Sequence, residues 1–373
     1  MAAATHNMLM NEVMLFEPVM QQSYLQKQFD RKFHSIATNT PGSPIEFFVK
    51  NAAKLYLDLN NSRFMMRCRI VKKDGSNMPA ADECKLGVVN LLLHLLFKEV
   101  TVLFNNKTVS DPSNMYAYRS YLETFLNCNG DIQKFRLKSE GWHRDKHDKM
   151  DEAEPKDNTG LVERRKYCAE SPDIVIIGRP HADVFHIEKL IRPGIDMSVK
   201  FMPNDDKFCI MSSDGDNLGP KVVIDYMNLI ICTEQLSDAA ELAHQTIVGN
   251  INMRLSYTRV LMKHVAIPAN SSTMCLDNIF TGVLPDLLVM GFVTDTAFAG
   301  SYTENPYNFK NFKIKRMDLF RNRTQVPKFG YIPNFTKKIY NYLTFQSSSV
   351  STKVTVVWTS AQKSGQMASI LFL

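Results

Sequence analysis

The histidines are the residues of this sequence with the most versatile chemistry, and there are nine of them. His181 and His186 lie in the segment HADVFH, five positions apart. Residues at that spacing share neither one face of a helix nor one face of a strand, so this pair is not expected to hold a metal ion. His94 lies in the apolar run LGVVNLLLHLLF, where a histidine is more often a hydrogen-bonded core residue than a catalytic base. The histidines therefore predict no metal ligand and no general base.

The carboxylates and thiols give no clearer sign of a site. Asp214 and Asp216 flank Gly215 and could suggest calcium, but the further oxygen ligands and the distal Glu of an EF-hand loop are missing. A plain turn is the better interpretation. Cys84 and Cys128 stand in no recognisable nucleophile context, and no G-x-S-x-G, Walker or H-E-x-x-H motif occurs. We therefore predict a protein that is not an enzyme, with no catalytic residues, no cofactor and no metal.

The composition is that of a folded chain with a large core. Of the 373 residues, 45% are hydrophobic and 10% are aromatic, which argues against disorder over most of the length. The length allows two or three domains. The formal net charge of +6, from 44 basic and 38 acidic residues, permits contact with nucleic acid without arguing for it.

The cysteines indicate a reducing compartment. They are odd in number and irregularly spaced, so free thiols are expected rather than a disulfide framework or a structural zinc site. The amino terminus shows no signal peptide, and the longest apolar run is too short to cross a bilayer. We therefore expect a protein that is neither secreted nor bound to a membrane. The seven positions are Cys68, Cys84, Cys128, Cys168, Cys209, Cys232 and Cys275.

Short strand patterns dominate the first part of the chain. Residues 1–40 are rich in Met and Gln and are interpreted as an arm outside the core. Residues 41–236 are predicted to form a first domain. Within it, LYLDLNNSRFMMRCRIVKKDG predicts two strands separated by a turn at Asn60-Asn61. HLLFKEVTVLFNNKTVSD predicts a further strand pair with a turn at Asn105-Asn106.

One helix and one charged segment interrupt these strands. Asp111-Pro112-Ser113 is a plausible helix cap, and the run that follows has no glycine or proline until Gly130. From Gly141 to Lys166 the chain is densely charged, which predicts a solvated loop. The buried stripe of the helix is expected to consist of Tyr118, Tyr121, Leu122 and Phe125.

The pattern is repeated in a second half. Residues 237–245, SDAAELAHQ, predict a connecting helix capped by Ser237, and a new strand series occupies 246–373. Many short strands, one notable helix and regular turns in two halves indicate an all-β fold of paired antiparallel sandwiches. A doubly wound nucleotide-binding fold is disfavoured because β-α-β alternation and G-x-G-x-x-G are absent from the sequence.

Four passages, in this order, resemble the major capsid (hexon-like) proteins of Polinton/Maverick elements and adintoviruses. They are LYLDLNNSRFMMRCRIVKKDG, VNLLLHLLFKEVTVLFNNKTVSDPSNMYAYRSYLETFL, LPDLLVMGFVTDTAFAGSYTENPYNFKNFKI and YIPNFTKKIYNYLTF. The resemblance covers roughly residues 40 to 345. Its most specific strings are Tyr116-Ala117-Tyr118-Arg119 with Tyr121-Leu122-Glu123-Thr124, and Asn305-Pro306 with Asn308-Phe309.

The resemblance implies a double jelly roll, in which two eight-stranded antiparallel sandwiches with a few short helices stand side by side in one chain. It implies a structural virion protein whose homotrimers are the pseudo-hexameric units of an icosahedral shell. Its partners would be other copies of itself and a minor capsid (penton) protein, with the encapsidated double-stranded DNA only an indirect partner. The expected location is the virion, and the cytoplasm or nucleus of a host cell during assembly.

The same analogy assigns roles to two segments. The charged loop 141–166 would project from the first barrel. The segment Gly300–Phe320, in which apolar and polar residues alternate, would supply a strand and a turn of the second barrel, with its aromatic residues between the sheets. It would thus specify packing and contact between subunits.

The end of the chain departs from the family pattern. After Phe345 it reads QSSSVSTKVTVVWTSAQKSGQMASILFL, in which STKVTVVWTS can form a strand. This leaves open an incomplete second barrel, whose unpaired strand edges would invite aggregation.

Two other functions also suit a β-sandwich. One is ligand or carbohydrate binding, and the other is that of a cupin-like metalloenzyme, for which histidine and carboxylate ligands must cluster.

Overall fold

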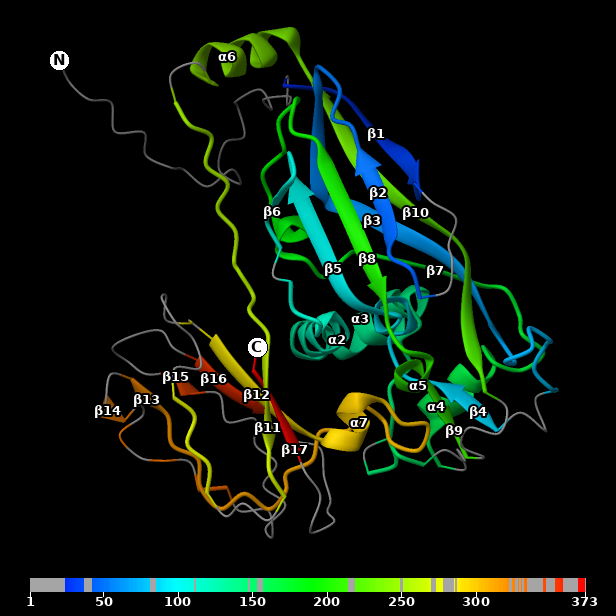
Figure 1. Ribbon diagram of the computed structural model, residues 1–373. Helices are drawn as coiled ribbons and strands as arrows, with labels where there is room; N and C mark the ends of the chain where they lie inside the picture. The colour runs from blue at the N-terminus through cyan, green and yellow to red at the C-terminus, as the bar shows by residue number, and fades with distance from the viewer. Residues whose placement is uncertain are drawn as a thin grey trace, which may run out of the picture.

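The computed structural model describes most of the chain between residues 24 and 321 and parts of the remainder (Figure 1). Asp111, Cys84, Asp214 and Asp216, for which predictions were made, lie outside the described residues. The described residues are 24–36, 42–80, 85–110, 112–146, 148–152, 157–213, 219–248, 251–269, 273–277, 285, 287–321, 324–325, 328, 330, 332–333, 345–346, 353–357 and 368–372.

The first half of the chain forms two four-stranded antiparallel sheets (Figure 1). Eight strands divided between two sheets are the composition of a jelly roll. The prediction of a β fold with a few short helices is confirmed. One sheet contains, in spatial order, β1 (Leu25–His34), β10 (Lys221–Leu236), β3 (Leu55–Val71) and β7 (Ile174–Gly178), and the other contains β2 (Ile45–Val49), β8 (Met197–Pro203), β5 (Phe97–Phe104) and β6 (Lys107–Thr108).

The two sheets share one hydrophobic core. From Phe64 to Ile70, β3 buries every second side chain, as a strand must when only one of its faces meets the core. The ring of Phe64 lies 5.2 Å from that of Phe201 on β8, and the ring of Phe97 on β5 lies 5.0 Å from Phe201, measured between centroids. Burial of each such side chain stabilises the fold by roughly 1.5–3 kcal/mol.

The strand β3 is continuous, and the predicted turn at Asn60-Asn61 is wrong. The chain passes this point as an irregularity, where the pairing with β10 shifts register between Ile230 and Cys232. The Asp58 carboxylate accepts hydrogen bonds from the backbone and side-chain amides of Asn61, at 3.2 and 2.6 Å. These local bonds occupy the polar side chains that would otherwise favour a turn, and the strand bends without ending.

The prediction that residues 1–40 form an arm is wrong for Leu25–His34. These residues form β1, which pairs with β10 from Leu25 opposite Leu236 to His34 opposite Asn228. No residue of β1 is fully buried, and charged side chains alternate with half-buried Phe29 and Phe33. Charged edge strands of this kind discourage unwanted pairing, and they show little of the apolar periodicity on which the sequence interpretation relied.

The turn and the helix predicted between residues 97 and 127 are confirmed. Asn105 and Asn106, between β5 and β6, have φ angles of 44° and 64°, as a two-residue turn with two left-handed positions requires. The helix α2 spans Tyr116–Asn127 and buries Tyr118, Tyr121 and Leu122, while Phe125 of the expected stripe is half-buried. Its N-cap residue is Met115, so the helix starts later than the cap expected at 111–113.

The described residues of the charged segment Gly141–Lys166 (141–146, 148–152 and 157–166) pack against the first sandwich and do not form a solvated loop. It contains α4 (Thr159–Arg165), and Trp142 and Arg164 are 2% and 0% exposed. Arg164 donates to the backbone oxygen of Val88 at 2.7 Å and pairs with Asp145 at 2.6 Å. Charge density misleads here because the pairing of Arg164 with Asp145 lets these two charges be buried, while others such as Lys166 and Glu163 stay exposed.

The helices α3 (Gly130–Lys134) and α5 (Asp206–Cys209) and the ribbon of β4 (Leu86–Val88) with β9 (Ile210–Ser212) lie with α2 and α4 at one end of the first sandwich (Figure 1). The other short helical elements of the first half are α1 (Leu92–Leu95) and the 3-10 turns η2 (Arg136–Glu140) and η3 (Asp183–His186).

The second half begins with α6 (Asp238–Val248), which lies where the connecting helix is predicted. Ser237 Oγ accepts a hydrogen bond from Ala240 N at 3.4 Å, the capping contact expected of it. A sheet of order β11-β17-β12-β16-β15 follows, in which β12 and β16 run parallel. This pair departs from the expected all-antiparallel second sandwich. The elements are β11 (Lys263–Ile267), β12 (Leu287–Thr294), α7 (Asp295–Ala299), the ribbon β13 (Phe320–Arg321) with β14 (Thr324–Gln325), β15 (Phe345–Gln346), β16 (Lys353–Val357) and β17 (Ala368–Phe372).

The segment Gly300–Phe320 is irregular, and the strand predicted from its alternation is absent; only Phe320 belongs to a strand. Phe312 and Lys313 have φ angles of 44° and 52°, which break an extended run. Tyr307 and Phe309 are nevertheless buried, at 0% and 1% exposure. The segment is therefore held by the burial of its aromatic side chains and not by ladder pairing.

Candidate functional site

The aromatic segment of the second half packs on helix α2 of the first. The rings of Tyr121 and Tyr307 stack with centroids 4.0 Å apart and planes within 12°. Tyr307 donates its hydroxyl proton to the backbone oxygen of Ala117 at 3.1 Å, and Tyr118 meets the Tyr307 ring edge-on at 5.8 Å. We call this contact, formed by Ala117, Tyr118, Tyr121, Tyr307 and Phe309, the aromatic joint.

Asp151 reinforces the aromatic joint from the charged segment. Its carboxylate accepts hydrogen bonds from Asn305 N at 3.0 Å and from Asn308 Nδ2 at 2.7 Å, and it pairs with Lys310 at 3.1 Å. The segment predicted to project as a loop thus ties the second half to the first.

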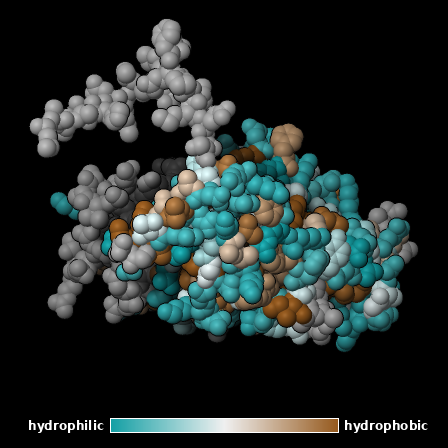
Figure 2. Space-filling model, turned by 90° about the horizontal axis from the view of Figure 1, so that it is seen from above, coloured by the Kyte–Doolittle hydropathy of each residue, from teal (hydrophilic) through white to brown (hydrophobic). Residues whose placement is uncertain are grey.

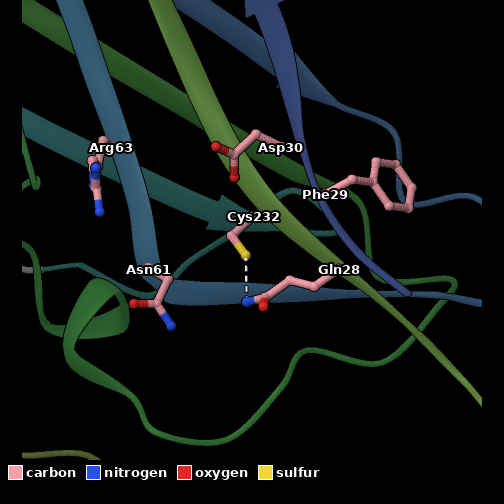
Figure 3. A pocket seen from close by; sticks show the side chains of 6 residues that line it. All are labelled: Gln28, Phe29, Asp30, Asn61, Arg63 and Cys232. Carbon is pink, nitrogen blue, oxygen red and sulfur yellow. Dashed lines mark hydrogen bonds between the residues drawn. The ribbon is translucent and has the colours of Figure 1, made fainter. Parts of the chain in front are cut away.

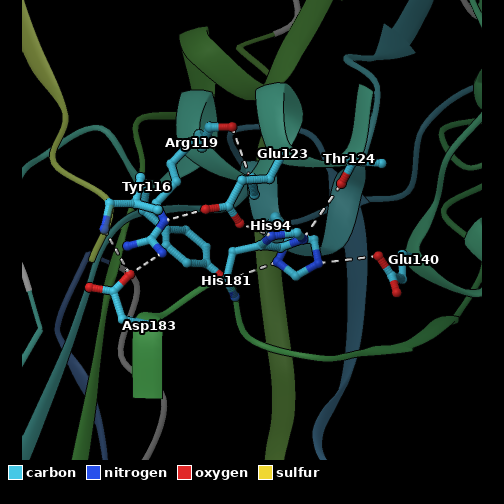
Figure 4. A network of polar contacts seen from close by, with 11 residues as sticks. His94, Tyr116, Arg119, Glu123, Thr124, Glu140, His181 and Asp183 are labelled. Atoms are coloured by element: carbon cyan, nitrogen blue, oxygen red, sulfur yellow. Dashed lines mark hydrogen bonds and ion pairs between the residues drawn. The ribbon is translucent and has the colours of Figure 1, made fainter. Parts of the chain in front are cut away.

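A polar network lies beside α2, at the end of the first sandwich (Figure 4). His94 from α1 makes contacts through both ring nitrogens: Nδ1 lies 2.8 Å from Tyr116 Oη, and Nε2 lies 3.3 Å from Glu140 Oε2. His181 Nδ1 lies 2.6 Å from Glu123 Oε2. The two imidazoles are 4.6 Å apart between ring centroids. The network therefore links α1, α2, η2 and the segment after β7.

Two further charges complete this network. Arg119 binds Glu123 Oε1 at 2.8 Å and also pairs with Asp183. Asp183 in turn accepts a hydrogen bond from Val260 N at 3.3 Å, in the stretch between α6 and β11. The guanidinium thus stands between two carboxylates, as a buried cation must for its charge to be compensated.

Burial and neighbouring charges set the protonation of the network. Burial lowers the pKa of His94 to about 4, although its bond to Glu140 acts in the opposite direction. Burial acts to raise the pKa of Glu123, but the bond from His181 and the charge of Arg119 outweigh it and hold the value at about 2. The pKa of Glu140 is also lowered, because contact with His94 outweighs its burial. At neutral pH His94 is therefore neutral and both glutamates are ionised.

The sequence argument about His181 and His186 does not apply in the fold. His181 lies in a loop and His186 ends the 3-10 turn η3, so neither helix nor strand spacing governs them, and their rings are 6.1 Å apart. His94 is buried and hydrogen-bonded, as predicted. Potential ligand atoms of His94, Glu140 and His181 lie within 4.8 Å of one another, as do those of Glu123, His181 and His186. Sequence reasoning missed the glutamates because no local spacing connects them to the histidines.

Cys128 is the remaining sequence candidate among the described residues, and its setting does not favour reactivity. Cys128 is a half-buried free thiol whose pKa is raised, chiefly by burial. Cys68, Cys209 and Cys232 are buried thiols outside any disulfide, and Cys168 is also buried. Thiolate formation is disfavoured where burial raises the pKa of a thiol, so Cys128 is poorly suited to act as a nucleophile.

A depression lies on the β1-β10-β3 sheet, lined by residues of all three strands (Figure 3). Gln28 and Cys232 meet across it, with Gln28 Nε2 3.2 Å from Cys232 Sγ. It is open and mostly polar, which is unlike the concave apolar pockets that bind small molecules. Its other lining residues are Phe29, Asp30, Asn61 and Arg63.

The surface seen in Figure 2 is largely polar, with hydrophobic residues scattered across it. On α6, Leu242 and Ile247 are 66% and 52% exposed.

None of the described helices combines the length and apolar character needed to span a bilayer.

No protein-family model matches the chain. An uncharacterized protein of Caenorhabditis elegans is 21% identical over 280 residues, which cover 73% of this chain and 64% of that protein. This chain therefore spans less than two thirds of the length of that relative.

Three solved structures of viral capsids or virus particles are similar in fold. The PBCV-1 virus capsid has a TM-score of 0.48 at 9% identity, covering 96% of this chain and 86% of that one. The Sputnik virophage structure has a TM-score of 0.45 at 8% identity, covering 97% and 85%. The mavirus major capsid protein has a TM-score of 0.40 at 13% identity, covering 72% and 57%.

Proposed function

We propose that this chain is a structural shell protein, a major capsid protein of the double jelly-roll type, that acts by associating with copies of itself. The observation that carries the proposal is the aromatic joint. The two strings most specific to the Polinton/Maverick resemblance, one containing Tyr121 and one flanking Tyr307, stand in different halves of the sequence and pack directly on each other. The residues that carry the sequence resemblance therefore lie together in one packed region of the structure.

The eight-stranded first sandwich supports the same function, because a jelly roll presents loops and strand edges at its rim and needs no catalytic centre to assemble. On this proposal the chain forms homotrimers of pseudo-hexagonal outline within an icosahedral shell, with a minor capsid protein as a further partner. It derives from a Polinton/Maverick-type element or an adintovirus, resides in the virion, and contacts packaged DNA only indirectly.

Electron microscopy of the purified 373-residue chain tests this function. We expect negative-stain images of particles with a six-sided outline and threefold averages. A matched sample carrying Tyr307→Ala should lose these particles, whereas Tyr257→Ala, at an exposed tyrosine, should keep them. Uniform particles of single-chain size in the wild-type sample would contradict the proposal.

A further inference from the structure

We propose that His94, Glu140 and His181 form a binding site for a zinc ion. His94 belongs to α1, Glu140 ends η2, and His181 lies between β7 and η3, so the three come from separate parts of the chain. One potential ligand atom of each lies within 4.8 Å of the other two. Two imidazoles and one carboxylate are a set that zinc accepts, with a fourth position open to water. This proposal departs from the sequence-based expectation of no metal ligand.

The interatomic distances distinguish ligands from their supports. Atoms bound to zinc at about 2.0–2.2 Å in tetrahedral geometry stand roughly 3.3 Å from one another. His94 Nε2 and Glu140 Oε2 are 3.3 Å apart, a long separation for a hydrogen bond to a carboxylate. His181 Nδ1 and Glu123 Oε2, at 2.6 Å, are instead at hydrogen-bond distance. Glu123 therefore supports the ligand His181 and is not itself a ligand.

Each histidine has a close supporting contact at its Nδ1 atom. His94 Nδ1 contacts Tyr116 Oη at 2.8 Å, and His181 Nδ1 contacts Glu123, whose other oxygen is fixed by Arg119. Histidine ligands in metal sites are oriented in this way by hydroxyls and carboxylates behind them. Figure 4 shows the two rings side by side between these supports.

The proton positions are compatible with binding. Because Glu123 Oε2 engages His181 Nδ1 at 2.6 Å, the nitrogen that would meet the ion is Nε2, which otherwise has, among the described residues, only Thr124 Oγ1 at 3.5 Å. When zinc binds His94 Nε2, the imidazole proton moves to Nδ1 and is donated to Tyr116 Oη, so that no proton is lost. Glu140 supplies one negative charge. Arg136 and Arg179 oppose the ion electrostatically. We therefore expect micromolar affinity.

The ion would act as a structural clamp. A small pocket lined in part by Tyr116, Arg119 and His181 borders the site at His181. Once bound, the ion would tie α1, η2 and the segment after β7 together. A ligand that binds the folded chain and not the unfolded one raises the melting temperature.

Metal titration of the full chain tests the site. Protein stripped with a chelator should bind one Zn²⁺ per chain by calorimetry, and zinc at about 100 times Kd should raise Tm by about 5 °C. Glu140→Gln keeps the size of the side chain but removes its charge, and should weaken binding more than about tenfold. The matched control Glu46→Gln, at an exposed glutamate paired with Lys200, should bind as the wild type does.

A second variant and a measurement without variants complete the test. His186→Ala should bind zinc normally, because His186 belongs only to the alternative group with Glu123 and His181. X-ray absorption at the zinc edge of the wild-type protein should show nitrogen and oxygen ligands with imidazole scattering, whether or not Glu140→Gln folds. Sulfur ligation, no binding by the wild type, unchanged affinity in Glu140→Gln, or lost affinity in His186→Ala would each overturn the assignment.

Discussion

Tyr121 of helix α2 and Tyr307 of the second half stack face to face, with ring centroids 4.0 Å apart. Stacked aromatic pairs contribute about 0.5–1.5 kcal/mol beyond the burial of their surfaces. The Tyr307 hydroxyl is also satisfied, by the backbone oxygen of Ala117, so the ring is buried without an unpaired polar atom. This one side chain therefore couples the two halves of the chain.

Truncation of Tyr307 should weaken that coupling. Tyr307→Ala removes a fully buried ring and leaves a cavity, and we expect the free energy of unfolding in urea to fall by about 3–5 kcal/mol. Tyr257→Ala, the same change at a side chain that is 39% exposed, should shift it by no more than about 0.5 kcal/mol. Equal losses in the free energy of unfolding in both variants would show that the aromatic joint contributes no more to stability than an exposed tyrosine does.

The contacts of Asp151 predict a local effect on the segment 305–310. Asp151→Ala leaves Asn305 N and Asn308 Nδ2 without their acceptor, and should cost about 1–3 kcal/mol. Hydrogen exchange followed by mass spectrometry should show faster exchange in peptides covering 305–310. Asp157→Ala, at an exposed aspartate of the same charged segment, serves as the control. Unchanged exchange in Asp151→Ala would argue against the tie between the two halves.

The buried pair of Arg164 and Asp145 predicts that the charged segment is required for folding. Arg164→Met leaves Asp145 buried without its cation, and should destabilise the protein by about 3–5 kcal/mol. Lys166→Met, in the exposed pair with Glu163, should cost less than about 1 kcal/mol. By the same reasoning, removal of Gly141–Lys166 should abolish folding. A soluble, cooperatively unfolding deletion variant would restore the interpretation of this segment as a projecting loop.

His143 predicts a loss of stability in mild acid. Burial and the charge of Arg164 lower the pKa of its ring below the usual 6.5. The unfolded chain therefore binds a proton at this residue more readily than the folded chain, so its contribution to stability is present above pH 6.5 and lost as pH falls through the folded pKa. Urea unfolding between about pH 7.5 and about pH 5.5 should show a steeper decline in wild type than in His143→Gln. Identical slopes would rule out the contribution of His143.

Local patterns predicted those parts of the fold that local interactions decide. The turn at Asn105-Asn106 and helix α2 follow from residue type and apolar spacing alone. The turn predicted at Asn60-Asn61 was wrong because the long pairing of β3 with β10 overrode the local turn propensity of the two asparagines. Tertiary pairing can override local propensity in this way. The network of His94, Glu140 and His181 was out of reach, since chain topology and not spacing brings these residues together.

The mass of the purified chain in solution tests the central claim, self-association into a shell unit, most directly. Size-exclusion chromatography with multi-angle light scattering should give three times the mass of one chain, and Tyr307→Ala should shift this toward one chain. A wild-type mass of a single chain at every protein concentration would contradict the capsid assignment.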